Sequence, residues 1–327
     1  QYGACAPYRA LCEAPGVVPG TVARLEHVPL DPPTAFKHFA IHTGGGRAEA
    51  AFQTRGTTLG GEQRGRHVVP SLSLYRASAL PPLRDALLAD RDSIPVASLI
   101  PSPERAPESS LSVMVGMAVD AFASDVVWLV DEKGGWSSEA LSALDELAGK
   151  GEPLLVVGTA LALQHAVERG RRGERTLPRL PAGTRIMETG GFKGARRQVT
   201  REELYDGMRA LTSVPIERVV NEYGMTELLS QLWEPVLSEG VASAGIHVPA
   251  PWLRVRALDP VSLDPVPEGE DGLLAFYDLA NLGSVSHILT EDVGSVVDGR
   301  VRLRGRSPGA EPRGCSRAMD ELMSAAG

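Results

Sequence analysis

The middle of this 327-residue chain alternates between two kinds of segment, and this alternation sets the fold class. Short apolar runs rich in β-branched residues are separated by stretches with helical spacing. Strands buried on both faces read as continuous apolar runs, and strands joined through helices become parallel neighbours. The sequence therefore predicts an α/β fold with a mainly parallel, helix-covered sheet, whose strands are expected at 112–117, 126–130, 154–157, 184–187 and 216–220.

Helices are expected between several of these runs. Residues 138–148 and 160–169 have helical spacing, and a third helix should begin at Thr200, because the spacing from Thr200 to Glu203 is that of a capping box. A further helix is expected to start near Ser71. It should end before the pair Pro81-Pro82, since proline removes a helix hydrogen bond.

The two ends of the chain differ from this middle. Prolines crowd the first 35 residues and predict an extended segment that wraps over a core, with Cys5 and Cys12 as packing residues. Beyond Pro249, short alternating strands and tight turns such as Asp298-Gly299 predict a smaller β-rich subdomain. We therefore expect an α/β core at 1–248 and a β-rich unit at 249–327.

Composition excludes some classes of function. With 43% hydrophobic residues and a net charge of -8, the chain should form a globular soluble protein without the basic face that nucleic acids or membrane surfaces require. Three scattered cysteines make no disulfide framework and fit the cytoplasm. No apolar run reaches the roughly 18 residues of a membrane-spanning helix. The chain begins at Gln1 rather than Met, so the residues leave open whether a leader segment has been removed.

Residues 52–67 contain a loop rich in glycine and threonine that ends in arginines. Glycines let the backbone approach a phosphate, while hydroxyls and guanidinium groups add hydrogen bonds and charge. The loop is not a Walker A motif, because Glu62 and Gln63 stand where Lys and Ser or Thr are required. The residues alone leave open a phosphate-binding loop and a plain surface loop.

A second candidate site follows the strand expected at 216–220, and reads Tyr-Gly-Met-Thr-Glu from Tyr223. In open α/β sheets, ligands bind beyond the ends of strands. Tyr223 could stack on a base, Thr226 could reach a phosphate, and Glu227 could hold Mg²⁺. The alternative is an ordinary strand end with a solvated glutamate.

A third candidate is the run at 289–294, whose Asp292 could accept both hydroxyls of a ribose, with Arg306 nearby. The same residues also suit an ordinary turn. His38 and His42 have the spacing of a zinc pair but no evident third ligand, so we expect no metal site there. No Gly-x-Ser-x-Gly elbow supports a serine hydrolase.

In combination and order, these motifs resemble those of the adenylate-forming enzymes, the superfamily of the acyl-CoA synthetases. Within it, the chain most resembles the bacterial acyl-protein synthetase (LuxE) family along essentially its whole length. The likeness rests on Cys-Ala-Pro-Tyr-Arg from Cys5, Ala-Phe-Lys from Ala35, Arg-Gly-Arg-His from Arg64, Thr-Gly-Gly-Phe-Lys-Gly from Thr189, Asp-Leu-Ala-Asn from Asp278, and the run from Gly305 to Ser316.

The resemblance implies that ATP and Mg²⁺ activate a carboxylic acid, expected to be a fatty acid, as an acyl-adenylate. The catalytic residues would be Thr226, Glu227, Lys193 and Cys315, and Glu227 would bind magnesium. The nucleotide would be held on its phosphate side by Thr54, Arg55, Gly56, Thr57, Thr58 and Gly60, and around the adenosine by Gly190, Gly191, Tyr223, Gly224, Met225, Asp292 and Arg306.

The chain departs from the superfamily pattern in two places. The phosphate loop usually carries a lysine after a proline, so positive charge must come here from Arg55, Arg64 or Arg66. The sequence also ends about 20 residues after Gly305, where most members begin a mobile C-terminal domain with a catalytic lysine. As in the shorter acyl-protein synthetases, that domain is expected to be absent or minimal, and Lys193 is the candidate replacement cation.

Cys315 is the candidate acyl acceptor. Arg313 and Arg317 flank it and would favour the thiolate, and the family is thought to pass the acyl group through a cysteine near the C-terminus. The alternative is a buried packing cysteine. Two other functions stay open: an acyl- or aryl-CoA ligase that uses free coenzyme A, and a non-catalytic scaffold. A fatty acyl reductase as protein partner is implied by the family alone.

Overall fold

The computed structural model describes residues 1–44, 48–54, 64–130, 135–190, 199–240 and 245–306. Its longer helices are α1 (Ala6–Glu13), α3 (Leu72–Leu87), α4 (Ser110–Phe122), α5 (Ser138–Gly149), α6 (Ala160–Arg171) and α7 (Arg201–Thr212). The short helices are α2 (Ala35–His38) and α8 (Val236–Glu239), with 3-10 turns at Leu25–His27 and Ile216–Arg218.

Most strands of the described residues belong to one 11-stranded sheet, ordered β10-β11-β12-β13-β9-β8-β7-β6-β5-β3-β4. Its parallel part contains β3 (Ile94–Ser98), β4 (Ala123–Trp128), β5 (Leu155–Thr159), β6 (Arg185–Thr189) and β7 (Val219–Tyr223). Its antiparallel part contains β8 (Leu232–Trp233), β9 (Ile246–Pro249), β10 (Leu253–Leu258), β11 (Gly272–Asp278), β12 (His287–Val297) and β13 (Arg300–Arg306). The hairpin of β1 (Ala50–Gln53) and β2 (Arg66–Val69) stands apart.

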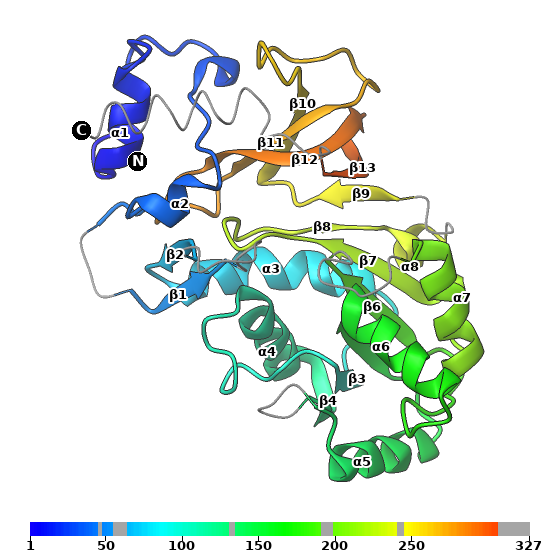
Figure 1. Ribbon diagram of the computed structural model, residues 1–327. Coiled ribbons are helices and arrows are strands. Elements are labelled where there is room, and N and C mark those ends of the chain that lie inside the picture. The colour runs from blue at the N-terminus through cyan, green and yellow to red at the C-terminus, as the bar shows by residue number, and fades with distance from the viewer. Residues whose placement is uncertain (45–47, 55–63, 131–134, 191–198, 241–244, 307–327) are drawn as a thin grey trace.

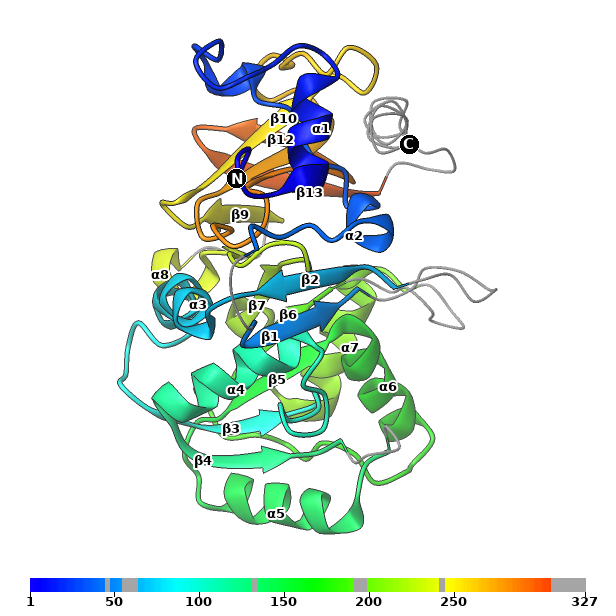
Figure 2. The same cartoon turned by 90° about the vertical axis from the view of Figure 1, so that its left-hand side faces the viewer.

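Helices cover both faces of the parallel part, as the sequence predicts (Figure 1). One core joins α3, α4 and the β1–β2 hairpin to one face, and a second joins α5, α6 and α7 to the other. A third core packs α1 and α2 against the antiparallel strands, where Cys5 and Cys12 are buried packing residues (Figure 2). Strand β9 pairs with both β8 and β13, so the sheet continues across the expected boundary at residue 248.

The strand prediction at 112–117 is wrong, because these residues belong to α4. Ser109 caps this helix by accepting a hydrogen bond from the Ser112 amide at 3.2 Å. An apolar run of this length suits a buried helix as well as a buried strand, so periodicity could not separate them. Strand β3 was not predicted, and its Pro95 lies where the β3–β4 register shifts.

The end predicted for the helix at Pro81 is also wrong, because α3 continues through both prolines to Leu87. Tyr75, Ala79, Leu83 and Leu87 recur every four residues and are all buried in one core. Tertiary packing of that continuous face outweighs the local cost of the prolines. The capping box at Thr200 and the turn at Asp298, which has a φ of 49°, are confirmed.

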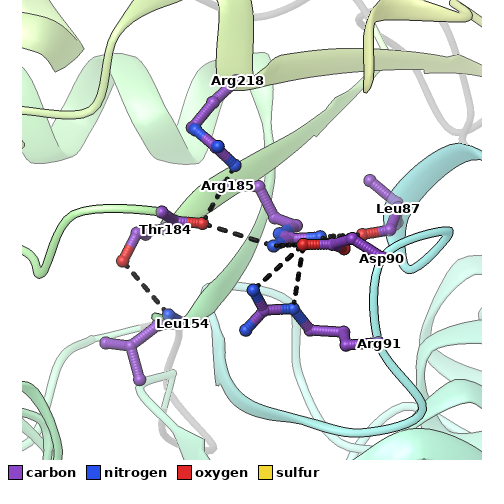
Figure 3. Close-up of polar contacts among 8 residues, drawn as sticks. Leu87, Asp90, Arg91, Leu154, Thr184, Arg185 and Arg218 are labelled. Carbon is purple, nitrogen blue, oxygen red and sulfur yellow. Dashed lines mark hydrogen bonds and ion pairs between the residues drawn. The ribbon is translucent and has the colours of Figure 1, made fainter. Parts of the chain in front are cut away.

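A buried arginine lies at the N-terminal end of strand β6, in the parallel part of the sheet. Arg185, the first residue of β6, has a side chain only 1% exposed and donates to Asp90 at 2.6 Å and to the Leu87 carbonyl at 2.7 Å (Figure 3). The guanidinium of Arg185 is the main cause that lowers the pKa of Asp90. This ion pair ties the end of α3 to the start of a central strand.

Candidate active site

The end of β7 meets the β12–β13 hairpin at Tyr223. Its hydroxyl donates to one Asp292 carboxylate oxygen at 2.6 Å, and its ring stacks on Phe276 with centroids 5.7 Å apart. Arg306, which faces Asp292 across the β12–β13 ladder, donates to the other carboxylate oxygen at 3.2 Å. Three of the predicted nucleotide-binding residues therefore form one connected cluster.

The charges of this cluster suit a sugar hydroxyl. Burial, followed by the Asp292 carboxylate, raises the pKa of Tyr223 well above its usual value, so the phenol stays a neutral donor. The Asp292 side chain is 17% exposed. A carboxylate has several acceptor sites, so Asp292 can accept further hydrogen bonds from hydroxyl groups besides those from the phenol and the guanidinium.

Glu227 lies in the same region, and its position corrects the solvated-glutamate alternative. The residue is 7% exposed, and burial is the main cause that raises its pKa to about 7. The charges of Arg306 and Lys37 act in the opposite direction and lower that pKa. A buried carboxylate of this kind is stabilised by a cation, and Mg²⁺ typically combines one or two carboxylates with phosphate oxygens. Glu227 therefore fits the predicted magnesium ligand.

The turn after Glu227 is held by Asp278, the last residue of β11, and by Asn281, which follows that strand. Asp278 accepts hydrogen bonds from the amides of Leu229 and Ser230 at 3.0 and 2.9 Å, and from the Ser230 hydroxyl at 2.7 Å. The side-chain amide of Asn281 donates to the Glu227 carbonyl at 2.7 Å. The antiparallel half of the sheet thus fixes the backbone that carries the predicted magnesium ligand.

The base of the glycine-rich loop lies beside this turn. Thr54 and Gly65 exchange hydrogen bonds, with the Thr54 amide donating to the Gly65 carbonyl at 2.9 Å and the Gly65 amide donating to the Thr54 hydroxyl at 2.8 Å. His67 then contacts the Thr226 carbonyl through Nδ1 at 2.7 Å and the Ser284 hydroxyl through Nε2 at 2.8 Å. Because a carbonyl only accepts, Nδ1 donates, and His67 connects the loop's second strand to Thr226.

His67 acts as a structural link in this arrangement. Burial lowers its pKa to about 4, so the ring is neutral at neutral pH and both nitrogens already have partners. Its ring packs edge-to-face against Phe36, with ring centroids 5.4 Å apart.

The ends of β6 and β7 add a second buried carboxylate. The Thr189 hydroxyl donates to Glu222, and burial raises the pKa of Glu222 to about 7. Gly190 follows with a φ of 74°, a conformation that favours glycine. At Gly224 space is the restriction, because a Cβ there would lie 2.5 Å from a Glu222 carboxylate oxygen. Thr189 and Glu222 were not predicted as site residues.

The described residues bring together Thr54, Tyr223, Gly224, Met225, Thr226, Glu227, Asp292 and Arg306, with Gly190 at the end of the neighbouring strand. Other predicted residues lie outside the described ranges, namely Arg55, Gly56, Thr57, Thr58, Gly60, Gly191, Lys193 and Cys315. Sequence reasoning missed the supporting roles of Asp278 and Asn281. Their motif was visible, but its hydrogen bonds to the turn after Glu227 join segments about 50 residues apart.

Among the described residues, no group of three or more His, Cys, Asp or Glu side chains could by itself hold a metal ion. Any magnesium there would need ligands from its substrate as well as Glu227. No helix within the described ranges is long and apolar enough to cross a membrane.

Comparison with known proteins gives the family. The sequence matches the acyl-protein synthetase family LuxE over residues 1–324, which is nearly its full length. The chain belongs to the LuxE family. The resemblance inferred from the motifs is thereby confirmed.

Two curated relatives match this LuxE-family chain over shorter segments, and both are named long-chain-fatty-acid–luciferin-component ligase. The protein of Aliivibrio fischeri is 48% identical over 50 residues, which cover 15% of this chain and 13% of the relative. That of Vibrio harveyi is 30% identical over 88 residues, 23% of this chain and 22% of the relative. The matched segments thus span under a quarter of either relative.

Among solved structures, the LuxE-family chain resembles ATP-bound MatB from Rhodopseudomonas palustris, with a TM-score of 0.54 and 14% identity. The match covers 80% of this chain and 49% of that protein. At this identity the likeness shows the fold alone. The α/β fold with a large mixed sheet resembles the N-terminal domain of adenylate-forming enzymes, as predicted.

Proposed function

We propose that this LuxE-family protein activates a carboxylic acid with ATP, forms an acyl-adenylate, and passes the acyl group to a cysteine thiol. The observation that carries the proposal is the cluster of Tyr223, Asp292 and Arg306 beside the buried Glu227. A long-chain fatty acid is the first substrate to test, because two curated relatives are named for that substrate. The expected location is the cytoplasm.

In the first half-reaction, a carboxylate oxygen of the acid attacks the α-phosphorus of ATP, and the bond to the pyrophosphate oxygen breaks. Asp292 would accept hydrogen bonds from the ribose, and Tyr223 would lie along the base. Both positions lie at the carboxyl edge of β7, where ligands of open α/β sheets bind. Holding the two reactants in line supplies much of the rate enhancement in such a reaction.

Magnesium is part of the proposal through Glu227. When bound, the ion would neutralise phosphate charge and stabilise the departing pyrophosphate. Glu227 suits that role because its carboxyl group is buried and its pKa is about 7 in the absence of a metal ion. The backbone bonds from Asp278 and Asn281 around Glu227 would hold the carboxylate in place with little loss of entropy on binding.

In the second half-reaction, a thiolate attacks the acyl carbonyl carbon and AMP leaves with the anhydride oxygen. Cys315 is the proposed thiol within this chain. An acyl-accepting partner, such as a fatty acyl reductase, would then receive the acyl group from Cys315. Lys193 is retained as a proposed cation near the nucleotide.

The test is carboxylate-dependent exchange of labelled pyrophosphate into ATP, measured with a panel of fatty and aromatic acids. We expect exchange with long-chain fatty acids, and we expect Glu227→Gln to abolish it while nucleotide-free folding persists. A folded wild-type protein that exchanges with no acid would support the non-catalytic alternative. Exchange with aromatic acids alone would reassign the substrate.

The acceptor is tested separately with labelled acid and ATP. We expect label on the wild-type protein that hydroxylamine releases, and no label on Cys315→Ser, although that variant still exchanges pyrophosphate. Cys5→Ser is a matched control, because Cys5 is buried in the third core. Formation of acyl-CoA by Cys315→Ser would instead favour the coenzyme A ligase.

A further inference from the structure

The lysine of α2 lies against the base of the glycine-rich loop. A Cβ built on Gly65 would lie 3.4 Å from the Lys37 Cγ and 2.9 Å from the Thr54 hydroxyl oxygen. The Lys37 stem and the Thr54 side chain therefore contact the same glycine. Since Thr54 and Gly65 also exchange backbone and side-chain hydrogen bonds, Lys37 lies where the loop leaves and rejoins the fold.

The helix that carries Lys37 is anchored to the backbone of the active site. Phe36 is buried and its ring meets His67 edge-to-face at 5.4 Å. His67 in turn donates to the Thr226 carbonyl at 2.7 Å. These two contacts connect α2 to the backbone at Thr226, next to Glu227. Lys37 therefore lies on an element that packs against the active site.

The charge of Lys37 acts on the predicted magnesium ligand. The charged side chains that act most strongly on Glu227 are Arg306, Asp292 and Lys37, and both cations lower the pKa of its carboxyl group. Arg306 is at the ribose side of the cluster, because it donates to Asp292 at 3.2 Å. Lys37 approaches instead from the side of Thr54 and Gly65, where the phosphates are expected.

We propose that Lys37 supplies positive charge to the phosphates of bound ATP, next to the loop base formed by Thr54 and Gly65. The proposal rests on the proposed adenylation reaction. It explains how the site can work although residues 62–64 of the loop read Glu-Gln-Arg and contain no lysine. An ammonium group on a flexible stem is a good point charge for phosphate oxygens.

Under this proposal, the ammonium group of Lys37 offsets the negative charge of the β- and γ-phosphates, which increases as pyrophosphate leaves. AMP lacks the β- and γ-phosphates, so its binding should depend much less on Lys37 than the binding of ATP does.

The experiment compares Lys37→Gln and Lys37→Arg with Lys150→Gln. Lys150 is a suitable control because it pairs with Asp125 at the exposed end of α5. Calorimetric titration with ATP and with AMP is combined with pyrophosphate exchange. We expect Lys37→Gln to lose at least tenfold in ATP affinity and about 100-fold in exchange rate, with AMP affinity changed less than threefold. Lys37→Arg should recover part of both losses.

Lys150→Gln should leave both affinities and the exchange rate unchanged. A merely structural role for Lys37 would lower AMP and ATP affinity equally.

Three results would overturn the proposal: normal ATP affinity and exchange in Lys37→Gln, equal losses for AMP and ATP, or no nucleotide binding by the wild-type protein. Failure of the proposed reaction gives a different result. In that case wild-type protein shows no exchange with any acid, while the ratio of ATP to AMP affinity still reports on Lys37.

Discussion

The hydroxyl of Tyr223 donates a 2.6 Å hydrogen bond to the carboxylate of Asp292, although 69 residues separate them in the sequence. Tyr223 is the last residue of β7 in the parallel part of the sheet, and Asp292 lies on β12 in the antiparallel part. This single contact therefore joins the two parts at the candidate active site. A nucleotide that binds there would contact both.

Tyr223→Phe tests this contact. The variant keeps the ring that stacks on Phe276 but loses the hydroxyl that orients Asp292. A hydrogen bond to a charged group is worth about 1.5–3 kcal/mol, so we expect ATP and AMP affinity to fall roughly tenfold or more. Calorimetric titration measures both affinities.

Tyr205→Phe provides the matched control for that variant. Its hydroxyl also donates to a buried carboxylate, that of Glu188, on the face of the sheet covered by α7. We expect a similar loss of stability without a change in nucleotide affinity. Equal affinity losses in the two variants would show that Tyr223 acts only through the fold.

Glu227→Gln should stabilise the nucleotide-free protein at neutral pH. Burial raises the pKa of Glu227 from 4.5 to about 7, so the folded state holds the proton longer than the unfolded state does. Stability is therefore lost as pH rises from about 4.5 through 7, by at most roughly 3 kcal/mol. Glutamine has no proton to lose, so its advantage over wild type should grow through that window and level off above it.

The difference in stability between Glu227→Gln and wild type must be measured at several pH values. His67 has a pKa lowered to about 4 by burial, which destabilises the folded state as pH falls below 6.5 and opposes the glutamate effect. Urea unfolding of Glu227→Gln and wild type from pH 5 to 8 cancels the histidine contribution. Glu222→Gln should show the same trend, because burial also raises its pKa to about 7, but should keep magnesium-dependent ATP binding. A flat difference profile for Glu227→Gln would contradict the prediction.

Local patterns predicted much of this fold. The capping box at Thr200 and the turn at Asp298 depend on residues a few positions apart, and both formed as expected. The prediction of a strand at 112–117 was wrong, because an apolar run alone does not show whether its backbone bonds within a helix or to a neighbouring strand. Strand β3 was not predicted from the sequence. Its Pro95 is tolerated at a register shift, and that shift depends on the neighbouring strand β4.

The candidate site likewise combines residues that short motifs reveal with residues that only the tertiary structure reveals. Tyr223, Glu227 and Asp292 stand in short motifs and could be named from the sequence. Asn281 could not, because its role is a hydrogen bond to the carbonyl of Glu227 that the sheet topology creates. The nearness of Lys37 to Gly65 likewise follows from tertiary packing of α2 beside β2.

Asn281→Ala should impair catalysis more than binding. The side-chain amide donates to the carbonyls of Glu227 and Val285 at 2.7 and 3.2 Å, and its removal frees the turn that carries Glu227. We expect kcat for pyrophosphate exchange to fall about 10–100-fold, since small displacements of a catalytic group are costly, with KM for ATP changed less than threefold. Leu279→Ala, two residues away and exposed, is the control that should leave both constants unchanged. A change in KM alone would refute a positioning role.

Asp90→Asn should destabilise the protein while leaving nucleotide binding intact. Its partner Arg185 is fully buried, and the variant keeps an acceptor oxygen but removes the charge that balances the guanidinium. Removing one partner of a fully buried pair costs about 3–5 kcal/mol, and since the Asp90 side chain is 52% exposed we expect roughly 2 kcal/mol. Asp92→Asn is the matched control, because Asp92 pairs with Arg84 on the surface and should cost under about 0.5 kcal/mol. Urea unfolding gives both values, and equal stability of the two variants would show that the Arg185 charge is balanced by its carbonyl acceptors alone.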